Sequence, residues 1–359
     1  MLLFILPLFS GGGAERVTLN LLKELHFHGY HVGIIVFNRS GRLLSLVQDE
    51  VPQDEVPIYD LNTNKLRKSI IPLIRLIYNL KPKVVFSTFG YINITLLAIY
   101  WTLPKITKIW TREANLPSIS LQNNNYPKLM KFLYGFFYKK SDKVICTSKR
   151  MKDEFILDFM VPRSIVEMLP NPVDVQKIRD FAMPVKRFDK GGVCYVAAGR
   201  LTFQKGFDCL LHWFSELENK KSTLVILGDG GSKNDLIQQS NKLDLQNRVK
   251  FLGFCSNPYP WYAGADVFLL PSRWEGMPNV ALESLACGTT VIATKESGGI
   301  NEIVENGDIV VADGEQEFIN AMNKVKVKDK SFIFNSLLPN KFTKENVVSI
   351  VEGWLNGTK

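Results

Sequence analysis

Short apolar runs alternate with amphipathic helical patterns along this chain, and the alternation occurs twice. In the first half, the predicted strands lie at 2–6, 32–37, 83–87 and 143–146, and the predicted helices at 14–28 and 68–80. In the second half, the predicted strands lie at 193–198, 222–227, 249–252, 266–270, 290–294 and 309–311, and the predicted helices at 206–218, 232–243, 279–286 and 315–325. This order is typical of parallel sheets covered by helices on both faces. The chain is therefore predicted to be an α/β protein with two doubly wound, Rossmann-like domains.

The alternation stops at Leu169-Pro-Asn-Pro-Val-Asp174, where two prolines can extend neither a helix nor a central strand. We expect an N-terminal domain over 1–175, a second domain over 190–340 and an amphipathic terminal helix over 343–357. Ligands of such folds bind at the carboxyl ends of the strands. With two domains, the cleft between them is the expected binding site.

Length, cysteine pattern and apolar runs indicate the cellular compartment and the class of protein. A length of 359 residues is sufficient for two α/β domains. The five cysteines are scattered and form no C-x-x-C pair, which argues against a disulfide framework or a zinc site and suits a reducing compartment. The apolar N-terminus lacks the basic region of a signal peptide, so a buried strand is expected there. No run of 18 clean apolar residues occurs, and no transmembrane helix is predicted.

Two glutamates, Glu275 and Glu283, are eight residues apart in the run Pro-Ser-Arg-Trp-Glu-Gly-Met-Pro-Asn-Val-Ala-Leu-Glu-Ser. Glu283 is the one charged residue of a short apolar helix that ends at Gly288, and such a helix is expected to be buried. A buried carboxylate needs hydrogen-bond donors, and sugar hydroxyls are suitable donors. Pairing with a local arginine or with backbone amides remains the alternative interpretation.

Two cations lie in the loop Gly199-Arg-Leu-Thr-Phe-Gln-Lys-Gly206, between a predicted strand and a predicted helix. Arg200 and Lys205 in such a loop, beside a helix N-terminus, can bind a diphosphate. A solvated surface pair is the alternative, because most arginines and lysines are exposed.

The spaced glutamates, preceded by Leu-Pro-Ser, and the Gly-Arg-Leu loop together resemble the signature of glycosyltransferase family 4. The resemblance covers nearly the whole chain and implies the GT-B fold, in which two Rossmann-like domains face each other across a cleft. It also implies retaining transfer of a sugar from a nucleotide-sugar. By this resemblance, Arg200 and Lys205 neutralise the donor diphosphate, Glu283 holds the ribose hydroxyls, and Glu275 holds the donor sugar.

Further donor-binding residues follow from the same resemblance. They are Gly12 and Gly13 of the Gly-Gly-x-Glu-Arg loop, Gly228 and Asp229 after a later strand, and Gly276, Met277, Pro278, Asn279 and Val280 between the two glutamates. A dinucleotide oxidoreductase is the rival interpretation of the first loop, Ser10–Arg16. It is disfavoured because Arg16 stands where the third glycine of G-x-G-x-x-G is required.

Glu113, in the segment Thr111-Arg-Glu-Ala-Asn115, lies where many family members have a histidine-containing pair that reaches the sugar. Since none of the four histidines lies here, Glu113 is predicted to take the polar role on the acceptor side. The alternative is structural: Arg112 and Glu113 pair with each other's neighbours at a strand end. The chain has no Asp-x-Asp motif, so neither a metal nor a cofactor is expected, and the UDP-sugar is a substrate.

The net charge of +9 is unevenly distributed. Residues 60–150 contain 16 Lys and Arg and 3 acidic residues, a balance of +13. Within this part, the pattern over residues 127–140 predicts a helix with an apolar stripe on one side. Lysines 128, 131 and 139 fall towards the other side. The stripe consists of Leu129, Phe132, Leu133, Phe136 and Phe137. Such a helix either lies on an anionic membrane surface or packs against the protein core. No nucleic-acid-binding motif is present, so nucleic acid is not expected as a partner.

The expected activity is therefore transfer of a hexose or N-acetylhexosamine from a nucleotide-sugar to a lipid-linked or oligosaccharide acceptor, forming an α-glycosidic bond without metal. The expected location is the cytoplasm, peripherally on the inner membrane. Two alternatives remain: a catalytically silent nucleotide-sugar-binding subunit, and a GT-B-fold sugar-nucleotide epimerase or hydrolase.

Overall fold

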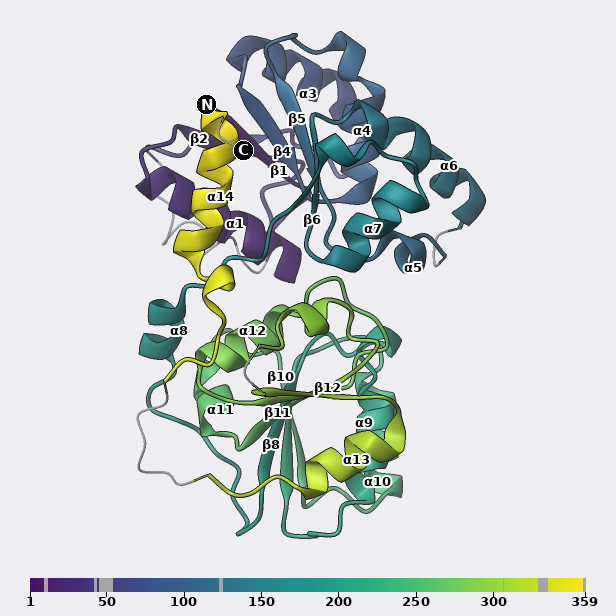
Figure 1. Cartoon of the computed structure of the whole chain (residues 1–359), viewed down its shortest axis with the longest axis vertical. Helices are drawn as coiled ribbons and strands as arrows, with labels where there is room; N and C mark the ends of the chain where they lie inside the picture. The colour runs from purple at the N-terminus through teal and green to yellow at the C-terminus, as the bar shows by residue number, and fades with distance from the viewer. Residues whose placement is uncertain are drawn as a thin grey trace. The chain divides into compact units, whose positions relative to one another are not determined.

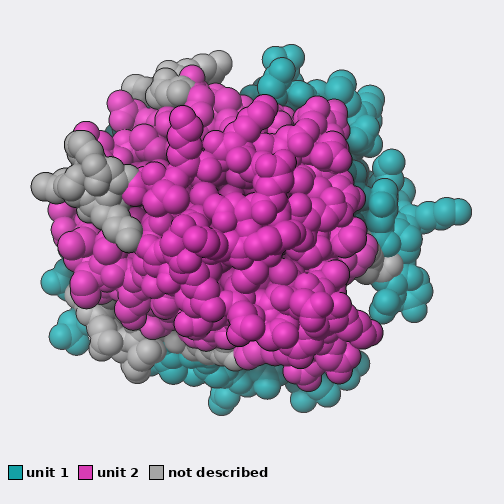
Figure 2. Space-filling model, turned by 90° about the horizontal axis from the view of Figure 1, so that it is seen from below, with its two compact units in different colours: residues 1–172, 344–359 teal, residues 173–343 magenta. Residues whose placement is uncertain are grey.

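The computed structural model describes residues 1–9, 12–41, 44, 54–122, 125–305, 307–328 and 335–357. The chain forms two compact units (Figures 1 and 2). Unit 1 comprises Met1–Pro172 and Lys344–Lys359, and unit 2 comprises Val173–Thr343. Ser10 and Gly11, which begin the predicted glycine-rich loop, lie outside the described residues.

Unit 1 contains a parallel seven-stranded sheet in the order β3-β2-β1-β4-β5-β6-β7. The strands are β1 (Leu2–Leu6), β2 (Val32–Val36), β3 (Ile58–Asp60), β4 (Val84–Ser87), β5 (Lys108–Arg112), β6 (Lys143–Cys146) and β7 (Val166–Met168). All residues of β1, β2 and β4 are buried, as expected for strands covered on both faces. The four strands predicted in this half are thereby confirmed.

Helices cover this sheet on both faces (Figure 1). They are α1 (Gly13–Phe27), α3 (Leu66–Leu80), α4 (Gly90–Ala98), α5 (Pro117–Gln122), α6 (Pro127–Phe137), α7 (Lys149–Leu157) and α14 (Lys344–Asn356), with 3-10 turns η1 (Tyr100–Thr102), η2 (Tyr138–Lys140) and η3 (Arg163–Ile165). The terminal helix α14 packs against α1. Its Trp354 ring meets Trp110 edge-on at 5.6 Å, and Lys344 forms an ion pair with Glu24 at 3.1 Å.

Unit 2 contains a parallel six-stranded sheet in the order β10-β9-β8-β11-β12-β13. The strands are β8 (Cys194–Ala198), β9 (Thr223–Leu227), β10 (Val249–Gly253), β11 (Val267–Leu270), β12 (Val291–Thr294) and β13 (Ile309–Ala312). The helices are α8 (Val175–Phe181), α9 (Phe207–Ser215), α10 (Lys233–Lys242), α11 (Tyr259–Gly264), α12 (Asn279–Ala286) and α13 (Glu315–Asn323), with 3-10 turns η4 (Phe203–Lys205), η5 (Gly298–Glu302) and η6 (Asn340–Phe342). All six strands predicted in this half are confirmed.

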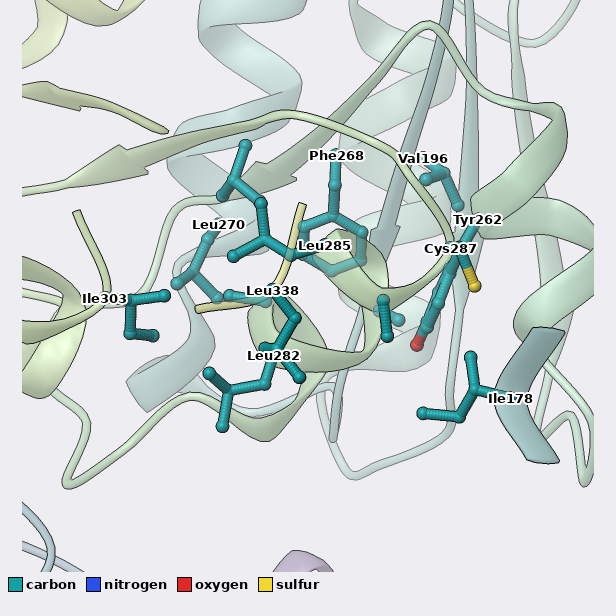
Figure 3. Close-up of a cluster of buried hydrophobic side chains, with 14 of the residues drawn as sticks. Ile178, Val196, Tyr262, Phe268, Leu270, Leu282, Leu285, Cys287, Ile303 and Leu338 are labelled. Carbon is teal, nitrogen blue, oxygen red and sulfur yellow. The ribbon is translucent and has the colours of Figure 1, made fainter. Parts of the chain in front are cut away.

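A core on one face of this sheet positions α12. Leu282 and Leu285 of α12 pack among the side chains of β8 and β11, of which Val196, Phe268 and Leu270 are labelled in Figure 3. All three are nearly inaccessible to solvent. Burying each such side chain contributes about 1.5–3 kcal/mol relative to its exposed state. The N-terminus of α12 is therefore fixed relative to the strand ends.

Both sheets have a point where the strand order reverses. In unit 1 it lies between β1 and β4, and in unit 2 between β8 and β11. In open parallel sheets, ligands bind outside the carboxyl ends of the strands at this point. The segments after β8, β9 and β11 contain the predicted donor-binding residues of unit 2, and the segment after β1 contains those of unit 1. Glu113, the predicted acceptor-side residue, follows β5.

Among the described residues, no helix combines the length and the apolar character that crossing a bilayer requires.

Candidate functional site

An ion pair joins the two loops at the reversal point of unit 2. Lys205 Nζ, in the loop after β8, pairs with Glu275 Oε1, in the loop after β11. Ser272 Oγ donates a second hydrogen bond to Glu275 Oε1 over 2.8 Å. The Glu275 side chain is 6% exposed and that of Lys205 is 20% exposed. A buried carboxylate is tolerated only with such partners, so the pair fixes both side chains.

A second layer of contacts holds these two loops together. Arg273 forms a two-pronged ion pair with Asp208 of α9, with nitrogen–oxygen distances of 2.8 and 2.7 Å. Its guanidinium also lies 3.9 Å from the ring centroid of Phe203. Gln204 Nε2 donates to the Trp274 carbonyl over 3.0 Å. Arg273 keeps Asp208 ionised, since their hydrogen bond lowers the pKa of Asp208 below its ordinary value.

Two glycines allow the loops to approach this closely. Gly206 has φ +66°, and a Cβ atom there would lie 2.0 Å from the Pro271 carbonyl oxygen. Gly298, at the start of η5, has φ +62°, and a Cβ atom there would lie 2.0 Å from the Glu275 carbonyl oxygen. Side chains of L-residues disfavour this backbone region, so the contact requires glycine at both positions.

The helix of the second glutamate differs from the expectation that α12 is buried all round. Its core-facing residues are buried, whereas Asn279, Val280 and Glu283 are only partly buried. These three positions share one side of the helix by their spacing of three and four residues. Glu283 therefore lies on a partly accessible side, which is where a ligand-binding carboxylate is needed.

The segment between the two glutamates leads into the N-terminus of α12. Gly276 is buried, and its carbonyl accepts from the Gly299 amide over 2.9 Å. Met277 is buried in the core of unit 2, and Pro278 is the N-cap residue of α12. The first amides of a helix carry partial positive charge and favour anions.

Arg200 and the predicted glycine–aspartate pair lie beside this loop. Arg200 is exposed at the carboxyl end of β8. The Gly228 amide donates to Gly253, and the Asp229 carbonyl accepts from the Leu201 amide over 3.0 Å. The Asp229 side chain is 44% exposed and forms a long ion pair of 3.9 Å with Lys233. Arg200, Lys205, Glu275 and Asp229 are thus all placed by loops at the carboxyl edge of one sheet.

In unit 1, the glycine-rich loop leads directly into α1. Gly12 is the N-cap residue of α1 and Gly13 is its first residue. The Glu15 carboxylate lies against Gly12, where a Cβ atom would be 2.4 Å from Glu15 Oε2. Glu15 is buried, and its charge adds to the effect of burial in raising the pKa of Tyr91 above its ordinary value. Glu15 and Tyr91 were not predicted as site residues.

Glu113 follows β5 and is buried among polar side chains. Its Oε1 accepts hydrogen bonds from the Tyr138 hydroxyl, from Asn93 Nδ2 at 2.9 Å and from the Tyr134 hydroxyl at 3.5 Å. Burial raises the pKa of Glu113 to about 7, and these hydrogen bonds and Arg112 oppose the rise. The Glu113 carboxyl therefore titrates near neutral pH, which is the range a general base requires.

Arg112, beside Glu113, is buried with a different partner. Its Nη2 donates to Asn171 Oδ1 over 2.5 Å, while the buried Nη1 has no acceptor within the part of the chain that the structure describes. Burial lowers the pKa of Arg112 to about 10. Asn171, which lies between the two prolines that end the first half, thus has a structural contact here. Arg112 and Glu113 thus each contact neighbouring side chains at this strand end, as the structural alternative for the segment expects.

Several residues of the site could not have been found by sequence reasoning. Tyr138 and Asn93 lie 25 and 20 residues from Glu113, and no local pattern connects them. Ser272 had a signal, because it belongs to the Leu-Pro-Ser run before Glu275. Of the predicted residues, Lys205 and Glu275 are brought into contact, whereas Gly12, Gly13 and Glu113 belong to unit 1 and are placed within that unit only.

The fold resembles several solved structures over the whole chain. Anabaena Alr3699/HepE in complex with UDP-glucose has a TM-score of 0.77 at 18% identity, with 99% of each chain covered. Sucrose-phosphate synthase from Thermosynechococcus elongatus has a TM-score of 0.78 at 15% identity and covers 99% of each chain. These likenesses define the class of fold, which is that of the GT-B glycosyltransferases.

Sequence comparison identifies the family. The family model "Glycosyltransferase Family 4" matches residues 11–177, and "Glycosyl transferases group 1" matches residues 178–331. A Campylobacter jejuni relative is named N-acetylgalactosamine-N,N'-diacetylbacillosaminyl-diphospho-undecaprenol 4-alpha-N-acetylgalactosaminyltransferase. It is 29% identical to this chain, and the alignment covers 91% of this chain and 90% of the relative. An Escherichia coli UDP-Gal:alpha-D-GlcNAc-diphosphoundecaprenol alpha-1,3-galactosyltransferase is 26% identical and covers 89% and 86%. The chain belongs to the glycosyltransferases, with a family 4 half followed by a group 1 half.

Proposed function

We propose that this glycosyltransferase is a retaining, metal-independent enzyme that uses a UDP-sugar. It transfers a hexose or N-acetylhexosamine to a lipid-linked or oligosaccharide acceptor and forms an α-glycosidic bond. The observation that supports this best is the contact between Lys205 and Glu275 at the reversal point of unit 2. There, a cation, a carboxylate and the start of α12 converge where nucleotides bind in doubly wound sheets.

Charge on the departing diphosphate is the first requirement of the reaction. Arg200 and Lys205 supply two positive charges from the loop after β8, and the amides at the start of α12 supply further hydrogen-bond donors. Fixed donors and cations stabilise charge that develops in the transition state without reorganising. These groups perform the task of a divalent metal, which is why metal independence is proposed.

Two glutamates hold the rest of the donor. Glu283, on the partly accessible side of α12, accepts hydrogen bonds from the ribose hydroxyls. Glu275 accepts from the donor sugar hydroxyls and stabilises positive charge at the anomeric carbon. Lys205 and Ser272 hold its carboxylate in one orientation for this task.

No protein nucleophile is assigned, so the acceptor attacks from the face that the diphosphate leaves. The acceptor hydroxyl loses its proton as the new bond forms, and the departing phosphate oxygen receives it. Glu113, whose pKa is about 7, acts on the acceptor side as a hydrogen-bond acceptor for that hydroxyl.

The acceptor class follows from the relatives. The Campylobacter jejuni and Escherichia coli proteins are named for diphospho-undecaprenol acceptors. We extend a lipid-linked acceptor to this chain, and with it a peripheral position on the cytoplasmic face of the inner membrane. The balance of +13 over residues 60–150 supports attraction to anionic lipid.

A nucleotide panel tests the donor site directly. UDP, GDP, ADP and CMP are added without metal to wild type, to Glu283→Ala and to a control, Glu218→Ala, whose side chain is exposed. Selective thermal stabilisation by UDP that is lost in Glu283→Ala and kept in the control is expected. Stabilisation that is equal in all three proteins would refute the assignment of Glu283.

Product analysis then tests the reaction. A retaining transferase gives an α-linked product from an α-linked UDP-sugar, with EDTA present, and consumes donor only when acceptor is added. Donor consumption without acceptor would identify an epimerase or hydrolase. Binding of UDP-sugar without any product across lipid-linked acceptors would identify a silent binding subunit.

A further inference from the structure

We propose that the outward face of α6 and of the following η2 turn, together with Trp101 of η1, docks on an anionic lipid bilayer. This surface extends the proposed function by naming the part of the chain that meets the membrane, and its biological meaning rests on that function. We call it the α6 surface; it consists of Trp101, Leu129, Phe132 and Phe136 with Lys128, Lys131, Lys139 and Lys140.

The α6 surface exposes large apolar side chains in one row. Leu129, Phe132 and Phe136 are 53%, 65% and 52% exposed, although core packing would bury such residues. Their spacing of three and four residues places them on one side of α6. The Phe132 and Phe136 rings stack with centroids 6.1 Å apart. This row differs from the predicted stripe, because Leu133 and Phe137 are only partly exposed and Phe137 packs against the core.

The opposite side of α6 is already occupied. Tyr134, together with Tyr138 immediately after the helix, is buried and holds Glu113. Helix α6 also packs against α4 and lies at the periphery of unit 1 (Figure 1). The outward row is thus additional to the core contacts that α6 needs for its own stability.

A lysine ties the row to a second exposed aromatic residue. Lys140 Nζ lies 4.7 Å from the Phe136 ring centroid and 5.3 Å from that of Trp101. Trp101 is 76% exposed. A tryptophan beside a basic side chain is characteristic of residues at the membrane–water boundary, where an apolar ring and a polar group are needed together.

Charge favours an anionic lipid surface over another occupant. Residues 125–141 contain four lysines and no acidic residue. Lys128, Lys131 and Lys139 are exposed, so a bilayer can receive the apolar row while the lysines meet lipid phosphates. Apolar burial and attraction to anionic headgroups add in such interfacial helices.

Vesicle binding tests the α6 surface with matched variants. The full chain is sedimented with vesicles of phosphatidylcholine alone or with an equal amount of phosphatidylglycerol. Two variants change the α6 surface: Phe132→Ser/Phe136→Ser and Lys128→Gln/Lys131→Gln/Lys139→Gln. Two matched controls change exposed residues elsewhere: Phe27→Ser/Phe254→Ser and Lys221→Gln/Lys242→Gln/Lys326→Gln. We expect binding to anionic vesicles to fall at least roughly tenfold in the two α6 variants and less than about twofold in the controls.

A second measurement reports how deeply Trp101 enters the bilayer, independently of the binding affinity. Lipids brominated on their acyl chains should quench tryptophan emission of wild type, and Trp101→Phe should lose that quenching. Unchanged vesicle binding in both α6 variants, or binding without Trp101-dependent quenching, would overturn the proposal. A change of oligomeric state in the α6 variants with vesicle binding intact would identify the surface as a protein interface and also overturn it.

The two proposals can fail separately. The α6 variants should keep wild-type turnover on a water-soluble acceptor analogue, because they leave the side chains around Glu113 in place. A chain that binds vesicles through the α6 surface but transfers no sugar to any acceptor refutes the proposed function and leaves the docking surface intact.

Discussion

Lys205 and Glu275 form an ion pair that joins the loop after β8 to the loop after β11. The two residues are 70 positions apart, and the strand order brings their loops together. The pair gives each residue a structural task as well as its proposed role towards the donor. Lys205 neutralises a buried carboxylate, and Glu275 orients an otherwise mobile lysine.

Breaking this pair should therefore affect both activity and stability. Lys205→Ala is expected to lower kcat/KM about 100-fold or more, as for loss of one group that stabilises a developing anion. It should also lower the free energy of unfolding by about 3 kcal/mol, because it leaves Glu275 buried without its cation. Urea unfolding and steady-state kinetics measure the two effects.

A double-mutant cycle separates the pair from other effects. Lys205→Ala/Glu275→Ala should recover part of the stability lost in Lys205→Ala, since it removes the unpaired charge. Activity should not recover. Strictly additive losses of stability would show that the two side chains are not coupled.

Gly206 should tolerate no side chain. Gly206→Ala would place a Cβ atom 2.0 Å from the Pro271 carbonyl oxygen at φ +66°, so the loop containing Lys205 must shift. We expect a loss of about 2–3 kcal/mol of stability together with weaker UDP binding. Gly231→Ala is the matched control, because a Cβ atom there meets nothing within 4 Å. Equal UDP affinity in both variants would contradict the close approach of the loops.

Stability should depend on pH through Glu113. The folded chain holds the Glu113 proton with a pKa of about 7, against an ordinary value of 4.5. Between these values the folded chain binds more protons than the unfolded chain, so the free energy of unfolding falls as pH rises. Glu113→Gln should remove this pH dependence, which amounts to a change of about 3 kcal/mol in the free energy of unfolding across this window. Parallel pH–stability curves for the two proteins would contradict the assigned pKa.

Tyr138 should position Glu113 and set the pH at which it ionises. Its hydroxyl donates to the Glu113 carboxylate, which favours the ionised form. Tyr138→Phe should therefore raise the pKa of Glu113 further, by about one unit, and move the rising limb of kcat/KM to higher pH. Tyr134→Phe is the comparison, because the Tyr134 hydroxyl lies at 3.5 Å and should shift the limb less. An unchanged pH profile in Tyr138→Phe, with only the amplitude lowered, would indicate a purely structural role.

The sequence predicted the sheets where strands are apolar throughout. Residues such as Leu2–Leu6 and Thr223–Leu227 are buried on both faces and stand out from their neighbours. Three strands of unit 1 were missed for physical reasons. β5 begins and ends with the cations Lys108 and Arg112, while β3 and β7 are three residues long and partly exposed.

The site was predictable where local patterns mark it. Arg200, Lys205 and Glu275 lie in loops whose glycines and prolines are visible in the sequence, and Glu283 is the one charged residue of the short apolar helix that follows. The surroundings of Glu113 were not predictable, because Tyr134 and Tyr138 reach its carboxylate through tertiary packing. The direction of α6 was also hidden: both its buried side and its outward row are apolar, so periodicity alone could not tell which faces the core.

The return of α14 to unit 1 imposes an order on folding during synthesis. Val347, Val348 and Val351 of α14 are buried in the same cluster as Leu19 and Leu22 of α1. The ribosome must add all of unit 2 before these valines exist, which takes roughly 10 to 40 seconds at ordinary elongation rates. During that interval α1 lacks its apolar partner, so the apolar side of α1 that α14 covers stays open to water until α14 emerges.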